Sequence, residues 1–102
     1  MHLLIEDNRE AIARLCLLHG VSRLEVFGSI VREDFDTGRS DVDILVEFDP
    51  PIAANFTNFL SLKESLEVLL GRSVDLLELS AIRNHRLRRY IEQSKLPVYD
   101  AA

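Results

Sequence analysis

Several residue types are scarce in this sequence of 102 residues, and each scarcity narrows what the protein can be. Cys16 is its single cysteine, which excludes an internal disulfide and a cysteine-based zinc site and fits a reducing compartment. No apolar run approaches the ~20 residues that span a bilayer, and the first residues lack a signal-peptide layout. We therefore expect a cytoplasmic protein that makes no membrane contact.

Positive charge is also scarce, because 12 Lys and Arg stand against 17 Asp and Glu and give a formal net charge of −5. This balance argues against unaided binding to nucleic acid, where Lys and Arg must neutralise phosphates. Residues 80–102 nevertheless carry a net charge of +3, which leaves −8 for the rest, with many acids between Glu33 and Asp49. The acidic middle and the basic tail are therefore expected to meet different partners.

The length, with 47% hydrophobic and 28% charged residues, predicts one globular domain over residues 1–102. Hydrophobic periodicity predicts helices over about 4–19, 56–70 and 80–96, the last with Ser80 as its N-cap. Strands are predicted near 24–27, 41–48 and 74–79, with a candidate fourth at Val98-Tyr99. The expected fold class is α/β, a small mixed sheet of three to four strands covered by helices. Inward-facing helix positions are expected at Leu18, Phe56, Phe59, Leu60, Ile82, Leu87, Tyr90 and Ile91.

The order of these elements predicts where polar residues meet. The helix between the second and third strands is a long crossover, so those strands are expected to be parallel. If the first strand runs antiparallel to the second, Gly28-Ser29 reaches the edge of the sheet where Asp41, Asp43 and Asp75 begin their strands. The sequence therefore predicts one site built from a glycine-serine turn and three aspartates.

The central motif is Gly28-Ser29, then eleven residues, then Asp41-x-Asp43 in an apolar strand. Residues two apart on a strand point the same way, so both carboxylates can lean onto ions roughly 3.5–4 Å apart, the spacing of two-metal phosphoryl-transfer sites. Magnesium prefers such oxygen ligands, and glycine lets a phosphate approach the backbone. The alternative is a plain turn followed by a solvated strand end; an EF-hand is excluded by the acid spacing.

These residues also resemble a known family. The stretch from Phe27-Gly28-Ser29 to Asp41-Val42-Asp43, with Val74-Asp75-Leu76 downstream, is similar to the minimal nucleotidyltransferases (MNT) of the polymerase-β-like superfamily, which are commonly paired with HEPN-domain proteins. The resemblance implies a polymerase-β-like nucleotidyltransferase fold, ATP as substrate with two magnesium ions, and transfer of a nucleoside monophosphate. By position it makes Asp41, Asp43 and Asp75 catalytic metal ligands, and Gly28, Ser29 and Arg32 nucleotide-binding residues.

Two departures from the family pattern concern the segment after Ser29. The spacer has eleven residues where the MNT antitoxin group has ten, a variation that the superfamily tolerates. Glu33 stands directly after Arg32 and would repel a triphosphate unless it points away. Arg32 therefore has two interpretations, a phosphate contact or half of a surface ion pair.

The group that accepts the nucleoside monophosphate is less well defined than the nucleotide that supplies it. The resemblance implies a tyrosine of a HEPN toxin, and the alternatives are a small molecule, a nucleic-acid end, or an antitoxin that only binds its partner. Self-association stays open, and the cluster Arg83–Arg89 is either a solvated helix face or a partner-binding surface. His2, His19 and His85 lack metal-ligand spacing, Ser29 has no evident histidine base, and Cys16 falls on an apolar helix stripe.

Overall fold

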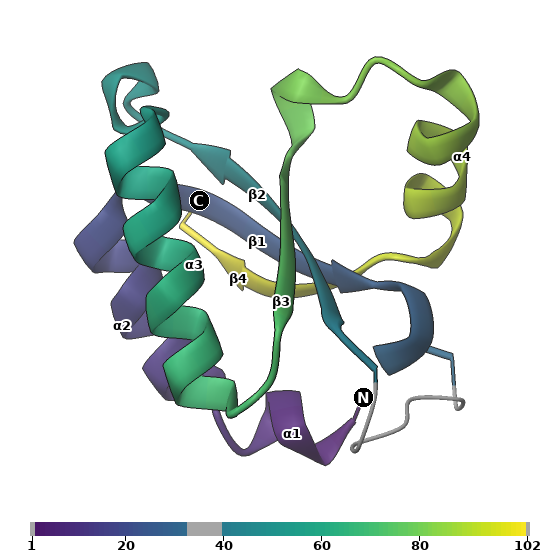
Figure 1. The fold of residues 1–102 in the computed structure, drawn as a ribbon, viewed down its shortest axis with the longest axis horizontal. Helices are drawn as coiled ribbons and strands as arrows, with labels where there is room; N and C mark the ends of the chain where they lie inside the picture. The colour runs from purple at the N-terminus through teal and green to yellow at the C-terminus, as the bar shows by residue number, and fades with distance from the viewer. Residues whose placement is uncertain (1, 33–39, 102) are drawn as a thin grey trace.

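The computed structural model describes residues 2–32 and 40–101, in which helices and strands alternate (Figure 1). The helices are α1 (Leu3–Glu6), α2 (Arg9–His19), α3 (Phe56–Leu70) and α4 (His85–Ser94). The strands are β1 (Val21–Phe27), β2 (Val42–Phe48), β3 (Val74–Glu78) and β4 (Leu96–Asp100). Short 3₁₀ turns join them at η1 (Gly28–Ile30), η2 (Pro51–Ala53) and η3 (Leu79–Ala81). Within the described ranges, no helix is long and apolar enough to cross a membrane.

The strands form one four-stranded sheet in the order β3-β2-β1-β4. β1 pairs antiparallel with both β2 and β4, and β2 pairs parallel with β3 across the crossover helix α3. These pairings confirm the predicted mixed α/β fold, including both strand directions. The candidate fourth strand is also present and extends over Leu96–Asp100, beyond the two residues predicted for it.

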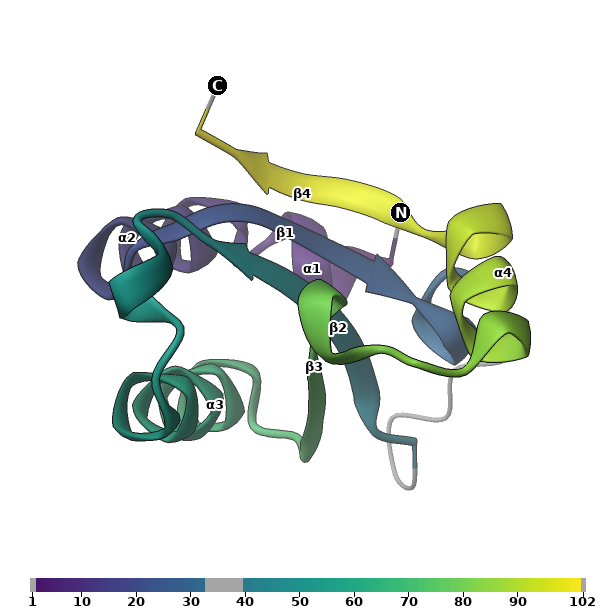
Figure 2. The ribbon, with the colours of Figure 1, turned by 90° about the horizontal axis from the view of Figure 1, so that it is seen from above.

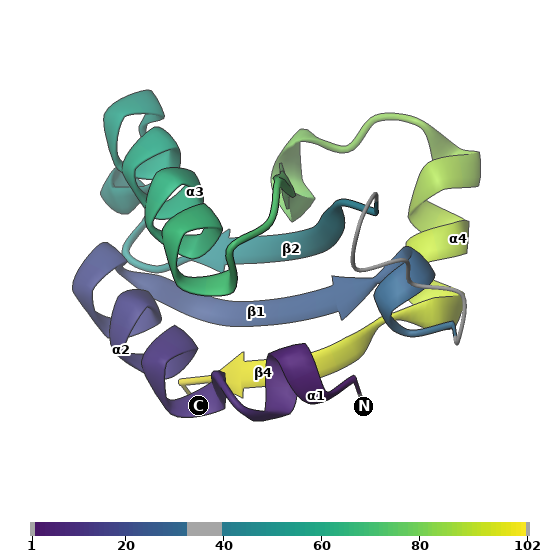
Figure 3. The same ribbon diagram turned by 60° about the horizontal axis from the view of Figure 1, so that its bottom comes forward.

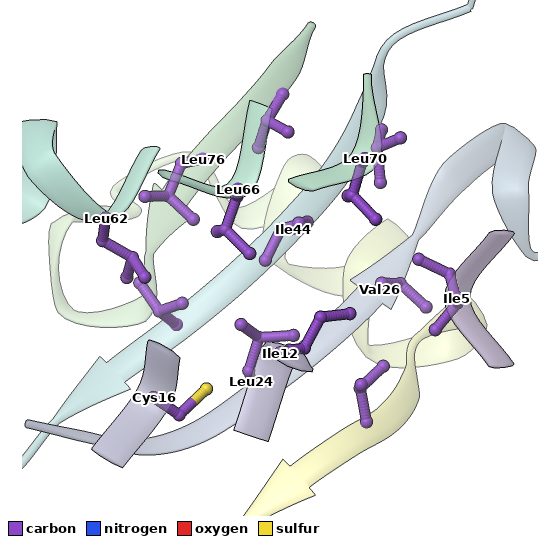
Figure 4. Packing of buried hydrophobic residues seen from close by; sticks show 14 of the residues in the cluster. Ile5, Ile12, Cys16, Leu24, Val26, Ile44, Leu62, Leu66, Leu70 and Leu76 are labelled. Atoms are coloured by element: carbon purple, nitrogen blue, oxygen red, sulfur yellow. The ribbon is translucent and has the colours of Figure 1, made fainter. Parts of the chain in front are cut away.

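The sheet has an apolar layer on each face. Val42, Ile44 and Val46 of β2 are buried in the main core with residues of α2 and α3, as Figure 4 illustrates for Ile44, Leu62 and Leu66. Side chains alternate along a strand, so Leu45 faces the other way, into a smaller cluster whose members are Phe27, Leu45, Ile82 and Ile91. Figure 3 shows α2 and α3 side by side and α4 set apart, near the end of β1.

Local hydrogen bonding divides the predicted helix over 4–19. The structure has a short α1 and a separate α2, with Asn8 between them at φ −111° and its side-chain amide donating to the Leu4 carbonyl at 2.8 Å. Asparagine competes for backbone groups in this way, which favours helix ends over helix interiors. Cys16 lies in the core as predicted, whereas Leu18 is 77% exposed.

The last helix begins later than predicted. Asn84, not Ser80, is its N-cap, because the Asn84 side-chain oxygen accepts hydrogen bonds from the backbone of Arg86 and Leu87. Asparagine caps as well as serine does, and Ser80 instead lies in η3 and donates to Glu78. The predicted inward positions Ile82 and Ile91 are buried, whereas Leu60, Leu87, Tyr90 and above all Phe56 remain exposed.

Candidate active site

The strand register brings two predicted aspartates together. Asp43 on β2 is paired with Asp75 on the parallel strand β3 and, on its other side, with Phe27 on β1. Neighbours in register point to the same face, and adjacent strands lie roughly 4.8 Å apart. The two carboxylates therefore lie side by side on the α4 face of the sheet, where Asp43 is half-buried and Asp75 is exposed.

Electrostatics link a third acid to this pair. Burial raises the pKa of Asp43 to about 6, and the charges of Asp75 and then Asp41 act in the same direction, while Arg32 acts against them. Asp41 is exposed and lies just ahead of β2, two residues before Asp43. Like charges held this close favour protonation, or a cation that neutralises them. The site thus has a local excess of negative charge.

Gly28 closes the other side of the Asp43 side chain. Its φ of +74° lies in the left-handed region, and a Cβ built there would overlap the Oδ2 atom of Asp43. Backbone strain and lack of space both therefore require glycine at this position. Ser29 follows Gly28 in η1 and is half-buried. The structure thus places Gly28 of the predicted glycine-serine turn directly against Asp43.

Arg32 has a contact that the sequence did not indicate. Its guanidinium donates a hydrogen bond to the Tyr90 hydroxyl and lies 5.9 Å from the centre of the Tyr90 ring. Tyr90 belongs to α4, 58 positions further along the chain, and its helical spacing suggested only a core position. The alternative partner Glu33 lies outside the described residues, and so does Asp36-Thr37-Gly38, whose sequence is typical of a turn.

Sequence reasoning also missed a buried ion pair on this face. Glu25 of β1 is 5% exposed, and Lys95 donates to its Oε1 atom at 3.3 Å. A glutamate buried at a strand position needs such a partner, because an unpaired buried charge is costly. Lys95 also reaches Glu92 at 3.5 Å. The pair ties β1 to the end of α4, and so helps to hold that helix on this face of the sheet.

The donor atoms suit a hard divalent cation. Asp41, Asp43 and Asp75 offer carboxylate oxygens, the ligands that Mg²⁺ prefers, and mutual repulsion is what a bound cation relieves. In ranges 2–32 and 40–101, no three or more His, Cys, Asp or Glu side chains converge as a metal-binding group. His19 instead packs in the helix layer, with its Nδ1 atom 2.8 Å from the Leu15 carbonyl oxygen.

Comparison with known proteins gives both sequence and structural similarity. Residues 9–98 match the family model described as nucleotidyltransferase domain. A Methanocaldococcus jannaschii protein, provisionally named a protein adenylyltransferase, is 38% identical over 78 residues, which are 76% of this chain and 77% of that protein.

Among solved structures, one described provisionally as a minimal nucleotidyltransferase is 35% identical, with a TM-score of 0.77 over 95% of this chain and 96% of that chain. One chain of a Shewanella oneidensis complex, between a tri-AMPylated HEPN toxin and an MNT antitoxin, has a TM-score of 0.68 over 94% of this chain and 72% of its own. At 19% identity, that last likeness concerns the fold.

Proposed function

The chain belongs to the nucleotidyltransferase domain family, and from this premise we propose that it transfers AMP from ATP to a hydroxyl group of a partner protein. The observation that carries this function is the in-register pair of Asp43 and Asp75 against Gly28. A protein acceptor is supported by the name of the M. jannaschii relative. Residues 1–102 act as one nucleotidyltransferase domain, because both apolar clusters share the same sheet.

Each predicted site residue then has a role. Asp41, Asp43 and Asp75 would hold Mg²⁺, which when bound neutralises the triphosphate and stabilises the leaving pyrophosphate. Gly28 lies against Asp43, and Gly28 and Ser29 bind the triphosphate through backbone amides and the serine hydroxyl. Arg32 contributes a phosphate contact from the same side, since its charge already acts on Asp43.

The transfer itself is an in-line displacement at phosphorus. The acceptor oxygen forms a bond to the α-phosphorus of ATP, while the bond from that phosphorus to the oxygen bridging to the β-phosphate breaks. Pyrophosphate leaves with the electron pair, and the proton of the acceptor hydroxyl passes toward the Asp75 carboxylate and then to water. Asp75 suits this role because it is exposed on the edge strand, where an acceptor can reach it.

The acceptor that we propose is a tyrosine hydroxyl of a HEPN toxin. The shared fold with a chain of the HEPN–MNT complex supports testing this partner first. The excess acidity of the chain outside residues 80–102 disfavours a nucleic-acid acceptor. Two alternatives stay in the test, namely an antitoxin that only binds its partner, and adenylylation of a small molecule.

The experiment mixes this protein with the product of the adjacent reading frame, Mg²⁺ and ATP labelled at the α-phosphate. We expect label on the neighbouring protein, and none with the Asp41→Asn variant. A tight complex without label, under conditions where ATP binds, would support inhibition by binding alone. If no complex forms and no label is transferred, the acceptor should be sought among small molecules that carry a hydroxyl group.

A further inference from the structure

The outer edge of β3 is open to a further strand. β3 is at the end of the sheet order, and the Val42 backbone N–H donates to the Ser73 carbonyl at 2.9 Å. In a parallel ladder the bonding direction alternates, so the main-chain groups of Asp75 point to β2 and those of Leu76 and Glu78 point away from it. Within the described residues, nothing pairs with this outward side of Leu76 and Glu78.

The first part of this edge is already hydrogen-bonded within the protein, whereas the later part is not bonded to any residue that the structure describes. The Val74 N–H, which also points outward, donates to the Glu67 carboxylate of α3 at 2.9 Å. Leu76 and Glu78 follow it without such a cap, and unpaired edge groups of this kind are where an extended peptide adds to a sheet. The open part of the edge therefore begins just after Asp75.

A mainly apolar cavity of about 460 Å³ lies at the end of this edge. Its walls come from the start of α3, the end of β3, and the segment from η3 into α4, which Figures 1 and 2 show around the upper end of β3. Phe56 is 76% exposed and Leu87 is 37% exposed, so two large side chains that the sequence assigned to the core line an open surface. Apolar groups in a concave site favour an apolar ligand group.

The cavity and the candidate active site lie along one strand. Asp75 and Glu78 are three residues apart on β3, and Glu78 lines the cavity. At roughly 3.3 Å per residue, they are about 10 Å apart. The cavity is at the end of β3 away from the aspartates, and its walls include neither Gly28 nor Ser29. A group bound there lies further along β3 from Asp75 and does not contact Gly28 or Ser29, the proposed triphosphate-binding turn.

We infer that the outer edge of β3 docks the acceptor segment of the partner protein. An extended segment pairs with Leu76 and Glu78, places one large apolar side chain in the cavity, and presents its hydroxyl to Asp75. The spacing along β3 sets the apolar residue two to four positions from the modified one in the partner sequence. This inference rests on the proposed AMP transfer. It adds which features of the partner segment are recognised, namely an extended backbone and an apolar side chain near the modified residue.

The side-chain test uses exposed positions, so that the fold is kept. In Phe56→Asp and Leu87→Asp we expect the KM for the partner protein to rise at least tenfold, because a carboxylate in the cavity repels an apolar group. Stabilisation by Mg²⁺ and ATP should be unchanged in both. Val68→Asp is the matched control, since Val68 is on the same helix as Phe56, is 84% exposed and does not line the cavity.

The backbone test needs no catalysis. Hydrogen exchange of the wild-type protein, with the partner but without ATP, should slow at the Leu76 and Glu78 amides, and Phe56→Asp should abolish that protection. Protection without any labelling of the partner would keep the docking edge and reject the proposed transfer. Normal labelling in both variants with no protection would reject the docking edge alone. Loss of stabilisation by ATP in the cavity variants would also overturn it, by assigning the cavity to the nucleotide base.

Discussion

Asp43 is half-buried on a central strand, with the charges of Asp75 and Asp41 acting on it. A carboxylate in such surroundings is less well solvated than in the unfolded chain and is repelled by its neighbours. The ionised Asp43 carboxylate therefore lowers the stability of the folded state. Residues kept at such a cost are typical of functional sites, because bound ligands relieve the strain.

The first prediction concerns the metal-free protein. Because the pKa of Asp43 is raised to about 6, the folded state binds a proton more tightly than the unfolded state, whose pKa is ~3.9. Stability is therefore lost as the pH rises from ~4 through about 6. Asp43→Asn lacks this loss, and its free energy of unfolding should exceed that of the wild type by on the order of 1 kcal/mol near neutral pH. Urea unfolding with chelator measures this.

The difference between Asp43→Asn and the wild type should shrink below pH ~4, where both side chains are neutral. A variant that is less stable than the wild type at neutral pH would instead make Asp43 a structural hydrogen-bonding residue. The same titration on Asp75→Asn gives a second comparison, because removing that charge relieves Asp43 of its largest repulsion.

The second prediction compares two glycines that both have positive φ. Gly28→Ala should lower the free energy of unfolding by about 2 kcal/mol or more, because backbone strain adds to overlap with the Asp43 carboxylate. Gly71→Ala has φ +65° but no atom within 4 Å of the added methyl group, so only the backbone cost of about 1 kcal/mol is expected. Equal losses in thermal unfolding would show that Gly28 is not packed against Asp43.

At the scale of elements, α4 carries Arg86, Arg88 and Arg89, three of the four arginines in the cluster Arg83–Arg89. Arg88 donates to the Leu79 and Ile82 carbonyls at 3.2 and 3.4 Å, so it holds η3 and the start of α4 together. Arg86 and Arg89 are exposed and line a shallow pocket beside Tyr90. The cluster that the sequence left open therefore divides into a structural arginine and a charged outer face.

The third prediction separates these roles. Reversing Arg86 and Arg89 to glutamate should leave the unfolding temperature near that of the wild type, slow association with an acidic partner surface, and weaken the salt dependence of that rate. Arg88→Glu should instead lower the free energy of unfolding by about 1–3 kcal/mol, because the partly buried carbonyls of Leu79 and Ile82 lose their hydrogen-bond donor. Stopped-flow association rates at two salt concentrations measure the first effect. An unchanged rate in the double variant would remove this face from partner binding.

The elements that sequence reasoning located are those with a strong repeating pattern. The apolar run of β2 between Asp41 and Pro50, and the helical stripe ending at Gly71, both correspond to the observed elements. The predicted helix boundaries differ from the observed ones where a side chain hydrogen-bonds to the nearby backbone, at Asn8 and at Asn84. Helical spacing predicts a core position for Phe56, but spacing alone cannot tell which helix face lacks a neighbour, and Phe56 is exposed.

At the scale of the molecule, the sheet order gathers acids that the sequence keeps apart. The sequence predicts that Asp41 and Asp43 lie together, because they are two residues apart in one predicted strand segment. It also predicts that Asp75 lies near them, because a crossover helix implies that the two strands it joins are parallel neighbours. The contacts of Arg32 with Tyr90 and of Glu25 with Lys95 were not readable, since they join residues 58 and 70 positions apart. Their positions depend on how α4 packs on the sheet, which no local pattern specifies.

The central claim is that the neighbouring carboxylates of Asp43 and Asp75 belong to one site that binds the metal and the nucleotide together. Thermal unfolding of the wild type, Asp43→Asn and Asp75→Asn with and without Mg²⁺ and ATP tests it without any partner. We expect metal and ATP together to raise the unfolding temperature of the wild type by several degrees, and the increment to vanish in Asp43→Asn and to shrink in Asp75→Asn. An increment that is the same in all three proteins would contradict the claim and place the nucleotide elsewhere.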